Sequence, residues 1–194
     1  MLLHKFTNYL NLLEDIALIK AGESVRFFKA IQFLQNYIEN FILIGGLSVS
    51  FFSPARLTHD VDVLVEFESD INNLFSLTKG SVKWVRKHAF IFEDIEVEVL
   101  SPEFLKLPIE VSNYIFSTKI THSSGLTTPS PEGVILLKLY AFRDIDKQDI
   151  YSIIKTQGNS LNFRNIKELL STQEQREFID KTLENLEFIL NDNF

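Results

Sequence analysis

The segment FILIGGLSVSFFSPARLTHDVDVLV, residues 41–65, decides the fold that we predict for this chain. Its first four residues are apolar and end at two glycines, a pattern typical of a buried strand followed by a tight turn. Residues 47–52 suit a short helix, which Pro54 stops because the residue before a proline avoids the helical conformation. A second strand is predicted from Leu57 to Val65 or Glu66.

The second strand carries two aspartates, Asp60 and Asp62, on one face, because successive side chains of a strand point to opposite sides. The alternate valines face the other side, toward the expected core. Two carboxylates this close raise each other's pKa unless a cation lies between them. Mg²⁺ binds through one or two carboxylates together with substrate phosphates, so the pair favours a magnesium site.

The glycine turn and the start of the second strand add groups that suit phosphate. Backbone N–H groups of Gly45 and Gly46, at the start of a helix and without a Cβ in the way, predict an anion site. Arg56 and Thr58 share the face of the aspartates and supply a cation and a hydroxyl. Taken singly, Asp-x-Asp is most often a solvated strand face and Gly-Gly only a turn. Their combination favours a nucleotide-phosphate site.

This segment resembles the first motif of the DNA-polymerase-beta-like nucleotidyltransferase superfamily, in its small bacterial branch, which includes abortive-infection (AbiEii-type) toxins. The matching residues are the glycine pair and Arg56-x-Thr58-x-Asp60-x-Asp62. Many members have Gly-Ser where this chain has Gly-Gly, with Ser48 two residues further on. The resemblance implies transfer of a nucleoside monophosphate from an NTP to an acceptor hydroxyl, with Asp60 and Asp62 holding two Mg²⁺ ions.

A second acidic pair, Glu96 and Glu98, lies in a predicted hairpin of residues 88–92 and 95–100 with a two-residue turn. The superfamily keeps a third catalytic carboxylate, usually an aspartate, on a strand next to the Asp-x-Asp strand. By resemblance we expect Glu98 in this role as a catalytic and metal-binding residue, with Glu96 in reserve. For each glutamate alone, a solvated outer face is an equal alternative. Glutamate in place of aspartate motivates another function, a catalytically inactive member that acts as a binding or antitoxin-like partner.

A helix predicted from Ser130, Pro131 and Glu132 to about residue 143 is followed by another that begins near Asp146 and ends before Gly158. Together they resemble the second signature of the superfamily, which carries a lysine. Here Lys138 interrupts an apolar run, and a buried ammonium requires anionic partners.

The resemblance implies that Lys138 faces the nucleotide, with triphosphate or the metal-site carboxylates as its partners; a lysine snorkelling at the helix edge is the alternative. It also implies that Gly45, Gly46 and Ser48 cradle the triphosphate while Arg56 and Lys138 neutralise its charge. Four further charged residues of the two helices are expected to form a structural ion-pair network: Arg143, Asp144, Lys147 and Asp149.

The predicted fold class is α/β, a minimal nucleotidyltransferase fold with a small mixed sheet of four or five strands flanked by helices. We expect a nucleotidyltransferase core with N-terminal helices over residues 1–128 and a C-terminal helical part over residues 129–194 packed on it. Residues 101–128 are expected to be irregular, with a turn at 123–125. The remaining predicted elements are a strand near 82–85 and helices over 3–20, 24–40, 71–78, 162–170 and 172–190.

Composition narrows the classes of function. The 194 residues include no cysteine, which excludes disulfides, thiolate zinc sites and cysteine catalysis. No apolar run reaches 18 residues, so we expect a soluble cytoplasmic protein with no membrane partner. The 18 phenylalanines are expected to fill the core and to form an oligomer or partner face.

The net charge of −7 argues against a surface built to wrap nucleic acid. One basic cluster around Trp84 could still meet RNA, although a solvated strand face is the simpler interpretation. The cluster consists of Lys79, Lys83, Arg86, Lys87 and His88. The expected partners are therefore an NTP, an acceptor that is RNA, protein or a small molecule, and a homodimer or antitoxin partner if the chain serves in a toxin–antitoxin or phage-defence system.

Overall fold

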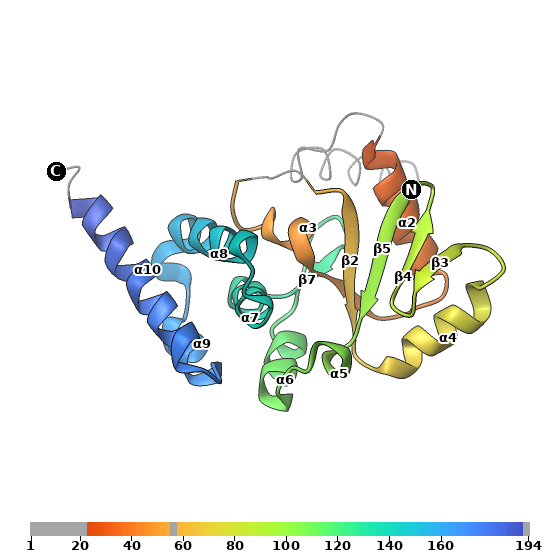
Figure 1. Ribbon diagram of the computed structural model, residues 1–194. Helices are drawn as coiled ribbons and strands as arrows, with labels where there is room; N and C mark the ends of the chain where they lie inside the picture. Colours follow the sequence, from red (N-terminus) through yellow and green to blue (C-terminus); the bar gives the residue numbers. More distant parts are fainter. Residues whose placement is uncertain (1–22, 55–57, 192–194) are drawn as a thin grey trace.

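The computed structural model describes residues 23–54 and 58–191 of the chain. The helix predicted over residues 3–20 and the predicted phosphate ligand Arg56 lie outside the described residues. The fold is α/β as predicted, with a mixed five-stranded sheet between two sets of helices (Figure 1). Within the described ranges, no helix has the length and apolar character needed to cross a membrane.

The strand order of the main sheet is β1-β2-β5-β4-β3. Strand β2 lies antiparallel to β1 and parallel to β5, and β5, β4 and β3 follow one another antiparallel. The two strands with acidic pairs are therefore direct neighbours at the centre of the sheet. The strands are β1 (Phe41–Leu43), β2 (Asp60–Val65), β3 (Lys83–Arg86), β4 (Ala89–Phe92) and β5 (Ile95–Leu100).

One face of the sheet packs against helices α2 (Glu23–Gln35) and α4 (Glu68–Thr78). The valines of β2 and β5 that alternate with the acidic residues are fully buried on this face, in contact with apolar residues of both helices. The alternation predicted for these strands is confirmed. It leaves the acidic residues on the opposite face, outside this core.

The opposite face is only partly covered by a second core. Ile42 and Leu64 of the sheet pack there with apolar residues of the C-terminal helices, which lie on the other side of β2 from α2 and α4 (Figure 1). This core joins residues from both sides of position 128. The acidic half of the sheet face, which carries Asp60, Asp62 and Glu98, borders a cleft instead.

Local signals fixed several boundaries correctly. Glu93 and Asp94 form the predicted two-residue turn between β4 and β5 with positive φ angles of 46° and 69°, as the hairpin turn requires. The Ser130 hydroxyl caps helix α7 (Pro131–Ala141) by accepting the Gly133 N–H at 3.2 Å.

The other C-terminal helices fall where they were predicted, to within a few residues. They are α8 (Asp144–Gln157), α9 (Phe163–Leu169) and α10 (Gln173–Asn191). A short 3₁₀ turn that was not predicted, η1 (Gly158–Ser160), follows α8.

The prediction of irregular chain from residue 101 onward is wrong for its first part, which forms helices α5 (Pro102–Leu105) and α6 (Ile109–Ser117). Pro102 is the first residue of α5, Pro108 directly precedes α6, and the Ser101 hydroxyl caps α5. Two short strands, β6 (Ile120–Thr121) and β7 (Thr127–Thr128), flank the predicted turn. Helix α3 (Gly45–Val49) also starts earlier than predicted, at the first glycine.

Candidate active site

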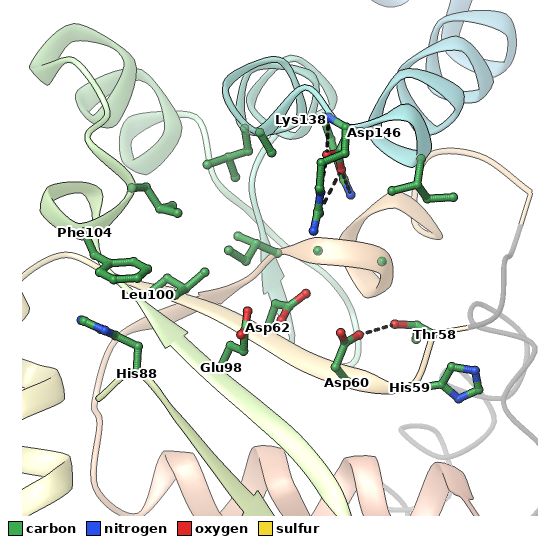
Figure 2. Close-up of a pocket in the computed structure, with 18 of the residues that line it drawn as sticks. Thr58, His59, Asp60, Asp62, His88, Glu98, Leu100, Phe104, Lys138 and Asp146 are labelled. Atoms are coloured by element: carbon green, nitrogen blue, oxygen red, sulfur yellow. Dashed lines mark hydrogen bonds and ion pairs between the residues drawn. The ribbon is translucent and has the colours of Figure 1, made fainter. Parts of the chain in front are cut away.

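Three carboxylates converge on one face of the two central strands. In the parallel register Asp62 lies opposite Glu98 and Asp60 opposite Glu96, so the acidic residues form two adjacent rows. Asp60, Asp62 and Glu98 point into a cleft of about 740 Å³, toward the helical wall that carries Lys138 and Asp146 (Figure 2). The convergence predicted from the alternation and the resemblance is present in the fold.

Asp62 is the most perturbed of these residues. The residue is half-buried, and its Oδ1 atom is buried with no hydrogen-bond partner among the described residues. Burial, followed by the charges of Asp60 and Glu98, raises its pKa from 3.8 to about 7, although Lys138 and Arg143 act in the opposite direction. The folded protein therefore holds this carboxylate in a position that favours its neutralisation.

Gly45 makes room for Asp62. A Cβ at position 45 would lie 1.8 Å from Asp62 Oδ2, and the φ of +61° is one that other residues rarely adopt. Gly45 and Gly46 both line the cleft. The glycine pair thus lets the backbone at the start of α3 approach the aspartate, a requirement that the sequence pattern alone did not reveal.

Ser48 was predicted to help bind the triphosphate, but it does not line the cleft. It is 1% exposed, and its hydroxyl donates to the Gly45 carbonyl oxygen at 2.9 Å. One turn into α3, the side chain points back along the helix and closes the glycine turn. We therefore assign Ser48 a structural role.

Thr58 lines the cleft and orients the first aspartate. Its hydroxyl donates to Asp60 Oδ1 at 2.9 Å, and it is 3% exposed, whereas Asp60 is exposed. Asp60 is thus fixed on one side and open to solvent on the other. The Thr58 hydroxyl is therefore engaged by the Asp60 carboxylate in this structure.

The third carboxylate is held by a cation that the sequence analysis placed elsewhere. Arg86 pairs with Glu98 and, at 2.5 Å, with Glu96. It reaches them over Ala89, which pairs with Arg86 on one side and with Glu98 on the other. Glu98 lines the cleft and Glu96 does not, which favours Glu98 over its reserve.

The basic cluster predicted around Trp84 is partly neutralised within the chain. Arg86 pairs with the two glutamates of β5, and Lys87 pairs with Glu68 at 2.7 Å. Trp84 packs against Phe75 and Phe90. These contacts favour the interpretation of the cluster as a structural edge of the sheet, and an RNA surface there stays a prediction.

Lys138 has partners other than those expected. Its buried ammonium lies 2.9 Å from Asp146 Oδ1 and 2.9 Å from Asp149 Oδ2, so it joins α7 to α8. Arg143 binds the same Asp146 carboxylate through Nε at 2.7 Å and Nη2 at 3.2 Å. Burial alone would raise the pKa of Asp146, but the hydrogen bonds and positive charges of Arg143 and Lys138 outweigh it and hold the pKa below its ordinary value. Two residues of the expected ion-pair network, Arg143 and Asp149, thus take part in one that also includes Lys138 and Asp146. The other two, Asp144 and Lys147, pair with each other at 3.4 Å.

One end of the cleft carries Phe104, which no sequence pattern marked, together with Lys87 and His88 of the predicted basic cluster. The rings of Phe104 and His88 pack together with their centroids 3.9 Å apart, and the His88 Nε2 lies 2.9 Å from Glu68 Oε1. Burial tends to raise the pKa of Glu68, but hydrogen bonds from Lys87, Ser101 and His88 outweigh it and lower the pKa to about 2. No local pattern predicts that they meet, because Glu68 lies in α4, His88 in the turn before β4 and Phe104 in α5.

The donor set suits a divalent cation in part. No group of three or more aspartate, glutamate, histidine or cysteine side chains lies close enough to hold a metal ion within residues 23–54 and 58–191. Mg²⁺ does not require three, since it is commonly bound through one or two carboxylates plus phosphate and water oxygens. The unpartnered Oδ1 of Asp62 beside Asp60 fits such a site.

Comparison with known proteins finds a matching family model. The family model described as "Nucleotidyltransferase of unknown function (DUF6036)" matches residues 24–189. No curated protein matches the sequence. The fold is similar to the crystal structure of ANT(2'')-Ia in complex with adenylyl-2''-tobramycin, with a TM-score of 0.48, 11% identity and coverage of 80% of this chain and 94% of that one. A solution structure of ANT(2'')-Ia gives a TM-score of 0.45 and 13% identity over 96% and 98% of the two chains.

Proposed function

We propose the site of catalysis on the premise that this chain belongs to the DUF6036 family of nucleotidyltransferases. Asp60, Asp62 and Glu98 form the site at which the enzyme transfers a nucleoside monophosphate from an NTP to an acceptor hydroxyl. The observation that carries the proposal is the convergence of these carboxylates, from two neighbouring strands, beside the glycine turn in the cleft. The abortive-infection branch suggested by the first motif stays a prediction.

Asp60 and Asp62 would hold Mg²⁺, and Glu98 would complete the site. When bound, two Mg²⁺ ions would stabilise negative charge on the attacking and leaving oxygens. Asp62 supplies an unpartnered buried oxygen, and Thr58 fixes the orientation of Asp60. Glu98 is engaged by Arg86, so its full participation requires this exposed ion pair to rearrange.

The remaining groups position the substrates. Gly45 and Gly46 present backbone without a Cβ to the cleft, which allows triphosphate to approach closely. Because attacking and leaving groups lie on opposite sides of the phosphorus in an in-line transfer, an NTP at the glycine turn directs the acceptor toward Glu98. Glu98 is then placed to accept the proton of the acceptor hydroxyl.

Incubation with each NTP labelled in its α-phosphate, with Mg²⁺ and with RNA or protein fractions or small hydroxyl compounds, tests this function and identifies the acceptor. We expect label transfer by the wild-type chain and none by Asp62→Asn. The matched control Asp144→Asn removes the same charge from a side chain that is 97% exposed, outside the carboxylate rows, and should transfer normally. Transfer by Asp62→Asn at the wild-type rate would contradict the assignment.

A role in a toxin–antitoxin or phage-defence system rests on the same resemblance and has its own test. If the chain is a toxin, expression of the wild type arrests bacterial growth and expression of Asp62→Asn does not. Equal growth with both variants would remove the toxin role and leave the transfer reaction untouched. An antitoxin-like partner or a homodimer would be detected by co-purification and by light scattering of the full chain.

A further inference from the structure

Two cations on the helical wall of the cleft face the acidic strands, and they differ in what they already bind. Lys138 belongs to α7, and Arg143 stands in the turn between α7 and α8. Both line the cleft, and both charges act on the Asp62 carboxylate. Their existing contacts determine which of them can bind a substrate phosphate.

Lys138 is committed to the protein. Its side chain is only 6% exposed, and two of its three N–H donors are used by Asp146 and Asp149, whose side chains are 0% and 4% exposed. Its single positive charge is therefore balanced by two buried carboxylates. An ammonium in this position joins two helices and has little capacity left for a triphosphate.

Arg143 is anchored at its base and open at its tip. Nε and Nη2 donate to the two oxygens of Asp146, which account for two of the five N–H donors of the guanidinium. The side chain is 70% exposed, and the charges of Asp62 and Glu98 contribute to raising its pKa. The outer donors are thus available on the cleft side, in a fork whose orientation Asp146 fixes.

Asp146 connects the two cations. It is fully buried and accepts four hydrogen bonds, from Lys138 Nζ and from the backbone N, Nε and Nη2 of Arg143. The chain turns sharply here, with Phe142 in the left-handed region at a φ of 51°. Lys138 therefore acts on Arg143 through Asp146, by holding the carboxylate that orients the guanidinium.

We propose that Arg143, and not Lys138, is the residue that binds the triphosphate of the nucleotide, and that Lys138 is a positioning residue acting through Asp146. This inference rests on the proposed function and assigns the phosphate contact within the same cleft. A guanidinium suits the role because its planar fork can bind a carboxylate on one edge and phosphate oxygens on the other. The Lys138 and Asp146 pair lies on the wall across from Asp60 and Asp62 (Figure 2), which places the phosphates between this wall and the carboxylates.

Calorimetric titration with Mg²⁺ and inorganic tripolyphosphate tests the phosphate contact without requiring that the preferred nucleobase be known. Titration with each of the four NTPs then repeats the test on whole nucleotides. We expect Arg143→Gln to weaken tripolyphosphate binding at least about tenfold, the effect of losing a hydrogen bond to a charged group. It should lower the unfolding midpoint less than Lys138→Met does, because Asp146 keeps the Lys138 ammonium and the Arg143 backbone N–H as partners. Arg143→Lys should recover little, because one ammonium cannot replace both edges of the fork. Lys138→Met should lower the unfolding midpoint and weaken binding less than Arg143→Gln.

The matched control is Arg164→Gln, which removes an arginine with an 86% exposed side chain, paired with Glu168 in α9, outside the cleft. It should bind tripolyphosphate as the wild type does. Wild-type affinity in Arg143→Gln would overturn the assignment, as would a larger loss in Lys138→Met at unchanged stability. Failure of the wild-type chain to bind tripolyphosphate or any NTP would overturn the proposed function together with this inference, whereas wild-type binding that Arg143→Gln leaves unchanged would overturn this inference alone.

Discussion

Replacement of Asp62 by asparagine should stabilise the metal-free protein at neutral and alkaline pH. The Asp62 carboxyl has its pKa raised from 3.8 to about 7 in the folded chain. Well below pH 3.8 the group is protonated in both the folded and the unfolded state and contributes nothing. Between these pKa values the folded state binds the proton and the unfolded state does not, so the free energy of unfolding falls as pH rises.

The size of this effect follows from the pKa difference. A shift from 3.8 to about 7, at about 1.4 kcal/mol for each pH unit, corresponds to about 4 kcal/mol lost by the time the group is fully ionised. Between about pH 5.5 and pH 8, a range that avoids strong acid, about 2 kcal/mol of this should be visible. Burial is the largest cause, so the loss persists at high salt better than a surface effect would.

Urea unfolding of the wild type and of Asp62→Asn at these two pH values measures the effect. The stability difference between the variants should change by about 2 kcal/mol in favour of Asp62→Asn, which moves the urea midpoint by roughly 1 M. Comparison across pH cancels the constant cost of burying an amide. Asp144→Asn, at a 97% exposed position, should run parallel to the wild type. Parallel curves for Asp62→Asn and the wild type would refute the reasoning.

Two further substitutions test the supports of the site. Gly45→Ala should displace Asp62, because the new Cβ would lie 1.8 Å from its Oδ2. The free energy of unfolding should fall by at least about 1 kcal/mol in urea unfolding, and Mg²⁺-dependent tripolyphosphate binding should be lost in calorimetry. Gly80→Ala, with open space around it, is the control in both assays. Asp146→Ala should destabilise the chain by about 3 kcal/mol in thermal unfolding, since it leaves Lys138 and Arg143 without their shared carboxylate, whereas Asp144→Ala should change stability little. An unchanged melting temperature in Asp146→Ala would contradict the role given to that carboxylate.

The local parts of this architecture could be predicted from the sequence because their causes are local. The period-two alternation around Asp62 and Glu98 set both acids on one face, and the turn at Glu93 and Asp94 set the hairpin. The choice between Glu98 and Glu96 could not be made this way, because both share that face. Only the position of the cleft and the register with Asp62 separate them.

The partners of each charged side chain were the part that the sequence did not supply. The apolar surroundings of Lys138 correctly required anions, but the turn at Phe142 brings Asp146 from eight residues away to meet it. Arg86 reaches Glu98 only because a strand with the small residue Ala89 lies between them. Such contacts depend on tertiary packing, and no periodicity in the chain records them.

The three carboxylates differ in the groups that stabilise their negative charge. This difference determines which carboxylate contributes most to the free energy of cation binding. Asp60 accepts a hydroxyl hydrogen bond from Thr58, and Glu98 has the Arg86 guanidinium. Asp62 alone of the three has a buried oxygen without a partner in the described part of the chain. A cation that binds the ionised form recovers free energy that the metal-free fold loses above pH 7, so metal affinity and folding stability are linked through one side chain. The same residue should therefore dominate both the pH dependence of stability without metal and the stabilisation that added Mg²⁺ produces.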